Sequence, residues 1–120
     1  MGNVLEKRAD GLIYSRFVGV VDDAAVEEFK RHVAPYLAEA TAESPLHFIA
    51  DAAEEGSWAF SARREFTHYF EDKRLGKVAI TNANRFTRVV ATFLMKATGR
   101  SDEVRFFETE KQAVQWLKAS

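Results

Sequence analysis

Residues 77–99 read KVAITNANRFTRVVATFLMKATG and decide the class of fold. The run Lys77–Asn82 predicts a short buried strand. Asn84 then suits the N-cap of a helix, and Gly99 suits the position just beyond its end. The apolar face predicted for this helix comprises Phe86, Val89, Val90, Phe93, Leu94 and Ala97. A buried strand followed at once by an amphipathic helix is the unit from which parallel sheets are built.

The same unit recurs on both sides of this stretch. Upstream, residues 46–50 predict a buried strand, because the run is apolar on both faces and too short for a helix. A loop over residues 52–60 and a helix over about residues 61–74 follow. Downstream, residues 104–107 predict the last strand, and a capping box at 109–112 predicts the final helix.

The start of the chain predicts a hairpin. Residues 4–9 and 12–18 alternate apolar and polar side chains around Asp10-Gly11, a pair typical of tight β-turns. A helix follows from Asp22 or Asp23 to about residue 40, in which Pro35 predicts a kink or a break near Val33.

The predicted order is β β α β α β α β α. Strands joined through helices require right-handed crossovers, so we expect an α/β fold with a mixed, mainly parallel sheet, an antiparallel opening hairpin and helices packed on the sheet. At 120 residues, one domain over residues 1–120 is expected.

Composition excludes several classes of protein. The chain is 47% hydrophobic and has no cysteine, which favours a globular protein without disulfides or thiolate metal sites. No leader peptide or membrane-spanning run is recognisable, so a cytoplasmic location is expected. The net charge of −1 offers no global field for nucleic acid, and no nucleic-acid partner is predicted.

Four segments in their order carry a family resemblance: Glu55–Trp58, Lys77–Ile80, Val104–Phe107 and residues 113–117. Together they resemble the SpoIIAA-like branch of the STAS domains. The resemblance implies a small α/β domain with a mixed sheet, a homodimer, a regulatory protein partner and no enzymatic chemistry. It extends to the lipid-transfer Sec14 fold, which implies a small apolar ligand.

The same resemblance implies regulation by phosphorylation of a serine. Better-known STAS relatives are anti-sigma-factor antagonists with a phosphorylated serine at the start of the helix after the third strand. Ser57 and Ser61 lie in that region here, but the Asp-Ser-Ser-Gly-type motif is absent. Glu54 and Glu55 would also repel an adjacent phosphate, which argues against the switch at these serines.

Charge is unevenly divided along the chain. Residues 1–60 carry 11 acidic and 5 basic side chains, whereas residues 61–120 carry 7 and 12. Arg63 and Arg64, and likewise Arg85 and Arg88, fall in first turns of predicted helices, where a cation opposes the helix dipole. Two interpretations stay open: these arginines bind a small anionic ligand or an acidic partner, or they pair with the acidic first half within the chain or across a dimer.

The predicted binding region lies at the carboxyl ends of the strands, where ligands of open α/β sheets gather. Its candidate residues are Asp51, Ser57, Trp58, Arg63, Asn82, Asn84 and Arg85. Trp58 belongs either to the core, to an apolar pocket or to a dimer interface.

No cofactor, metal site or catalytic constellation is predicted. His32, His47 and His68 lie on different elements without the spacing of a metal pair. The leading hypothesis is a non-enzymatic domain that binds a protein partner or a small anionic or amphipathic ligand near residues 51–61. The alternative is a small enzyme that uses Asp51 and the helix-start arginines on an anionic substrate.

Overall fold

A mixed five-stranded sheet forms the centre of the molecule in a computed structural model, which describes residues 2–119. The strands lie in the order β1-β2-β4-β6-β7, where β1 (Val4–Lys7) pairs antiparallel with β2 (Ile13–Arg16). The remaining strands are β4 (Leu46–Asp51), β6 (Leu75–Thr81) and β7 (Val104–Phe107), all parallel to β2. The expected α/β fold with an antiparallel opening hairpin is confirmed.

The opening hairpin turns as predicted. Gly11 adopts a φ of +87°, and the Asp10 carboxylate accepts a hydrogen bond from the backbone N–H of Leu12 at 3.1 Å. Glycine adopts this left-handed backbone without a steric penalty, and the aspartate side chain stabilises the turn.

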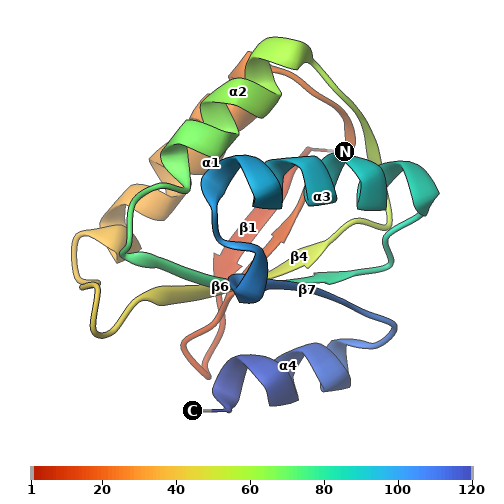
Figure 1. Ribbon diagram of the computed structural model, residues 1–120. Helices are drawn as coiled ribbons and strands as arrows, with labels where there is room; N and C mark the ends of the chain where they lie inside the picture. Colours follow the sequence, from red (N-terminus) through yellow and green to blue (C-terminus); the bar gives the residue numbers. More distant parts are fainter. Residues whose placement is uncertain (1, 120) are drawn as a thin grey trace.

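Helices cover the two faces of the sheet unequally (Figure 1). The helices α1 (Asp23–Leu37), α2 (Phe60–Tyr69) and α3 (Arg85–Thr98) lie on one face, and α4 (Glu110–Lys118) lies on the other. A short 3₁₀ helix, η1 (Ser101–Glu103), precedes β7. The chain crosses over in the same hand as it passes to successive strands of the sheet, and for this reason α1, α2 and α3 lie on the same face.

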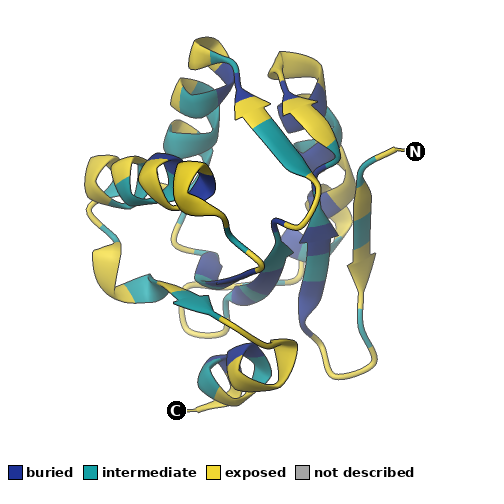
Figure 2. Ribbon diagram, turned by 90° about the vertical axis from the view of Figure 1, so that its right-hand side faces the viewer, coloured by how far each residue is buried: buried dark blue, intermediate teal, exposed yellow. Residues whose placement is uncertain are grey.

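Each face has its own hydrophobic core, and the central strands between them are largely buried (Figure 2). The core beneath α1 and α2 is rich in aromatic rings, with Phe29 and Phe66 at 5.2 Å between ring centroids and Phe66 and Phe70 at 4.8 Å. The core beneath α4 is smaller and aliphatic, built around Ile49 and Leu117.

The prediction of a loop over residues 52–60 is wrong for part of this stretch. It contains a strand, β5 (Glu55–Trp58), which pairs in parallel with β3 (Gly19–Val21) in a separate two-stranded sheet. A Cβ at Gly56 would lie 2.9 Å from the carbonyl carbon of Gly19, so the pairing requires glycine there. The two partners lie far apart in sequence and leave no local pattern.

Two predicted helices also differ from their expected course. The first does not break near Val33 but continues to Leu37, because Pro35 stands in its last turn and removes only one backbone hydrogen bond. The second ends at Tyr69 rather than near residue 74. Beyond it, the Asp72 carboxylate accepts hydrogen bonds from the backbone and side chain of Arg74 and stabilises a turn.

The caps and the end of α3 agree with the prediction, but its apolar face does not. Asn84 accepts a hydrogen bond from the N–H of Thr87 at 2.8 Å, and Gly99 ends the helix with a φ of +71°. Val90 is buried, whereas Phe86, Val89 and Phe93 are 48%, 64% and 58% exposed. The apolar pattern is wider than the surface that α2 and the sheet cover.

Candidate functional site

Asp51 lies at the carboxyl end of β4, within a network of hydrogen bonds. Its carboxylate accepts from the hydroxyl of Tyr14 at 2.7 Å, from the amide of Asn82 at 3.0 Å and from the N–H of Ala53 at 3.0 Å. Burial favours a higher pKa for Asp51, but the bonds from Asn82 and Tyr14 prevail and hold the pKa below its usual value. Asp51 thereby ties β2, β4 and the end of β6 together.

The other predicted site residues are only partly brought together. Asn82 donates a hydrogen bond to Asp51 and adopts a φ of +57°, while the side-chain oxygen of Asn84 caps α3 by accepting from the N–H of Thr87. Ser57 lies exposed on β5, and Arg85 lies exposed at the start of α3. The anion-binding group therefore stays a prediction, with Asp51 and Asn82 as its only hydrogen-bonded pair in residues 2–119.

The helix-start arginines do not pair with the acidic half of their own chain. Within residues 2–119, Arg63, Arg64, Arg85 and Arg88 form no ion pair. Arg88 instead stacks over the ring of Phe106 at 4.7 Å. Pairing with the acidic half of the same chain is therefore not found among residues 2–119, while anion binding and pairing across a dimer stay predictions.

The two serines considered for phosphorylation differ in their surroundings. Ser57 is exposed, whereas the Ser61 hydroxyl donates to both carboxylate oxygens of Asp23 at 2.8 and 3.0 Å. A phosphate on Ser61 would meet this carboxylate and repel it.

Trp58 belongs to the core and also lines a cavity. It is 8% exposed and packs edge-on against Phe17 and Phe66, at 5.6 and 5.2 Å between ring centroids. Its indole N–H donates to the Glu55 carboxylate at 2.6 Å. The side chain thus forms part of the wall that separates the aromatic core from the space beneath α3.

Two adjoining, partly open hollows lie between α2, α3 and the sheet, and each has a volume of about 80 Å³. Their shared wall is apolar and comprises Phe66, Phe70, Val78, Ile80, Ala91 and Leu94. Protein cores rarely leave voids larger than a water molecule, so an apolar space of this kind under a helix is a candidate ligand site.

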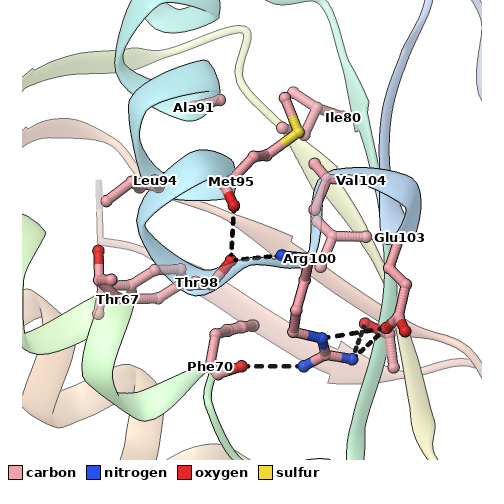
Figure 3. Close-up of a pocket in the computed structure, with 13 residues that line it drawn as sticks. Thr67, Phe70, Ile80, Ala91, Leu94, Met95, Thr98, Arg100, Glu103 and Val104 are labelled. Carbon is pink, nitrogen blue, oxygen red and sulfur yellow. Dashed lines mark hydrogen bonds and ion pairs between the residues drawn. The ribbon is translucent and has the colours of Figure 1, made fainter.

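Of the two hollows, the one lined by Met95 and Arg100 is called the outer hollow, and the other is called the inner hollow. Figure 3 shows the outer hollow, with Leu94 and Met95 of α3 above and Phe70 below. Arg100 marks its lower limit. The guanidinium donates to the carbonyl of Phe70 at 2.9 Å and to that of Leu75, and it pairs with Glu103. These bonds fix the end of α3 to the turn between α2 and β6.

Three polar side chains face the inner hollow: Ser15 of β2, Glu55 of β5 and Thr87 of α3. Burial raises the pKa of the Glu55 carboxyl, and the bond from Trp58 offsets part of that effect. Thr87 is 4% exposed, and its hydroxyl has no hydrogen-bond partner within residues 2–119. Sequence reasoning counted Glu55 as part of an acidic loop and missed Thr87 because its neighbours are distant in sequence.

No group of three or more His, Asp or Glu side chains that could hold a metal ion occurs in the described part of the chain. Among residues 2–119, no helix is long and apolar enough to span a bilayer.

A mixed sheet with three helices on one face and one on the other agrees with the small α/β domain expected from the sequence. The chain belongs to the SpoIIAA-like family, whose model matches residues 12–118. The family resemblance drawn from the sequence is confirmed. No protein of curated function shows significant similarity to the chain.

Solved structures share this fold. An uncharacterised Shewanella loihica PV-4 protein with a SpoIIAA-like fold has a TM-score of 0.72 at 19% identity, covering 97% of this chain and 92% of that one. The anti-sigma factor antagonist SpoIIAA in its unphosphorylated form has a TM-score of 0.69 at 15% identity, covering 99% and 100%. The Bacillus cell fate determinant SpoIIAA in its phosphorylated form gives 0.56 at 18%, covering 98% and 100%. At these identities the likeness is one of fold alone.

Proposed function

We propose that this chain is a non-enzymatic binding domain that holds a small apolar or amphipathic ligand in the cavity between α2, α3 and the sheet. The observation that carries the proposal is the pair of adjoining hollows of about 80 Å³ each. A purely structural core would close such a space, because unfilled volume forfeits packing contacts.

The predicted binding region contributes to this cavity. Glu55 and Trp58, from the stretch after the third predicted strand, line its inner part. Asp51, Ser57 and Arg63 are not among the lining residues. The geometry therefore supports an amphipathic ligand in this cavity better than an anionic ligand at the strand ends.

The test is a titration with toluene, followed by NMR chemical shifts of the residues that line the cavity. Ala91 lines both hollows, so Ala91→Met would fill them and lower the affinity at least tenfold. Ala97→Met places the same side chain on the exposed part of α3 and should leave binding unchanged. No binding to the wild-type chain, or equal binding to both variants, would contradict the proposal.

A second candidate function is the binding of a protein, favoured by the exposed stripe of Phe86, Val89 and Phe93 along α3. Such a stripe on a single domain is typical of an interaction surface. SpoIIAA is an anti-sigma factor antagonist, and a regulatory protein partner of this chain, or the predicted homodimer, would cover the stripe. If the stripe joins two copies, sedimentation should give a dimer that Val89→Glu converts to a monomer; a wild-type monomer would direct the search to other partners.

The alternative of a small enzyme is less well supported. General acid or base catalysis needs a group that can reach the substrate and exchange a proton near neutral pH. Asp51 is engaged by Tyr14, Asn82 and Ala53, and its pKa is lowered.

A further inference from the structure

The wall of the inner hollow is apolar except at three side chains that come from different parts of the chain. Ser15, Glu55 and Thr87 belong to β2, β5 and α3, and α3 packs against β5. Apolar ligand sites generally contain a few such polar groups, which orient the ligand. The question is whether these groups are already satisfied within the protein.

The hydroxyl of Thr87 has no hydrogen-bond partner within residues 2–119, in contrast to the hydroxyls of Thr67 in α2 and Thr92 in α3. Thr67 donates to the carbonyl of Arg63 at 2.8 Å, and Thr92 donates to that of Arg88 at 2.7 Å, each one turn earlier. Thr87 is the third residue of α3, so the carbonyl one turn earlier lies outside the helix. Its hydroxyl stays buried without a partner among residues 2–119.

The position of Thr87 sets it apart from other unpartnered groups. The Arg63 Nε and the Tyr69 hydroxyl are also buried without a partner, but neither residue lines the inner hollow. An unpaired buried hydroxyl is destabilising, and a hydrogen bond from a ligand would remove that penalty.

Glu55 supplies a second polar contact. One carboxyl oxygen, Oε1, accepts from the Trp58 indole, and Oε2 has no hydrogen bond within residues 2–119. No cation lies close enough to Glu55 to shift its pKa, and burial favours its neutral form. An anionic head group would therefore find no counter-charge here, whereas a neutral hydroxyl can donate to Glu55 and accept from the Thr87 hydroxyl.

The size of the cavity limits the body of the ligand. The two hollows of about 80 Å³ adjoin; each is about half, and the two together are about equal to, the roughly 150 Å³ of an engineered apolar cavity that binds benzene. The surrounding rings of Phe17, Trp58 and Phe66 suit the edge or face of one aromatic ring.

We infer that the cavity selects a neutral ligand about the size of one aromatic ring that carries a single hydroxyl group, held by Thr87 and Glu55. This inference rests on the proposed function of the cavity as a ligand site. It adds to that proposal the chemical class of the ligand, of which phenol is the simplest member.

The experiment compares phenol with toluene, which has nearly the same shape but no hydrogen-bonding group. Both are titrated into the wild-type chain and into Thr87→Val, which removes the hydroxyl and preserves the shape. Phenol affinity should fall about tenfold in Thr87→Val, with toluene affinity unchanged. Thr92→Val, whose hydroxyl bonds to Arg88, should alter neither affinity. Glu55→Gln keeps an acceptor oxygen for Trp58 but replaces Oε2 by an NH2 group that only donates, so it should weaken binding of the phenol hydroxyl and leave toluene unchanged.

The outcomes separate the inference from the proposal on which it rests. If toluene binds and Thr87→Val leaves the ratio of phenol to toluene affinity unchanged, the selection by Thr87 is wrong while the cavity remains a ligand site. If neither compound binds the wild-type chain, the proposed function and this inference both fail.

Discussion

Replacing Arg100 by methionine should cause one of the largest losses of stability in this domain. The Arg100 guanidinium donates to the carbonyls of Phe70, at 2.9 Å, and Leu75, and it pairs with Glu103. Its side chain is only 18% exposed. Methionine preserves the aliphatic stem but leaves these carbonyls without a donor.

The magnitude follows from the bonds that are lost. Hydrogen bonds from charged donors contribute about 1.5–3 kcal/mol each, and breaking a buried charged network typically costs about 3–5 kcal/mol. We therefore expect Arg100→Met to lower the free energy of unfolding by about 3–4 kcal/mol, after a discount for partial exposure. Domains of this size have about 5–15 kcal/mol in total, so the variant should still fold.

Urea unfolding followed by tryptophan fluorescence and circular dichroism measures this loss. Arg85→Met is the matched control, because Arg85 is exposed and forms no hydrogen bond or ion pair within residues 2–119. It should change stability by less than about 0.5 kcal/mol. A loss below about 1 kcal/mol for Arg100→Met would refute the role assigned to these hydrogen bonds.

Three further outcomes are expected from variants and pH. Gly76→Ala should destabilise by about 1–3 kcal/mol, because its Cβ would overlap the His47 Nδ1, whereas Gly2→Ala meets nothing; equal melting temperatures would contradict this. Burial lowers the pKa of His47, so its unfolded form binds the proton more tightly; stability should fall as pH drops below about 6.5, and the fall should be shallower in His47→Gln. Burial raises the pKa of Glu55, so its neutral carboxyl contributes to the stability of the fold below the unfolded pKa, and this contribution is lost as pH rises. Urea unfolding should therefore show that Glu55→Gln is more stable, relative to wild type, at pH 8 than at pH 4.

Local chemistry explains which elements were predictable. The turn at Asp10-Gly11 and the caps at Asn84 and Thr109 depend on residues within a few positions of each other, and all are found as predicted. Apart from β3 and β5, the order of strands and helices follows from the same short-range patterns. These features required no knowledge of which segments meet in space.

The elements that sequence reasoning missed depend on distant segments. The pairing of β3 with β5 requires Gly19 and Gly56 to approach closely, and nothing local indicates that approach. The cavity arises in the same way, since Thr87 gains its apolar surroundings only when β5 and the sheet lie beneath α3. Composition and periodicity cannot show that three packed segments leave a space between them.

The exposed side of α3 combines two features, of which only the stacking of Arg88 over Phe106 stabilises the folded monomer. Arg85 and Arg88 stand in the first turn, where their charge opposes the helix dipole, and neither forms an ion pair within residues 2–119. Val89 and Phe93 expose apolar surface beside them. A sequence shaped by monomer stability alone has no reason to place cations and apolar side chains there together. An acidic partner surface with an apolar centre would complement both features, which makes this face of α3 the place to test the second candidate function.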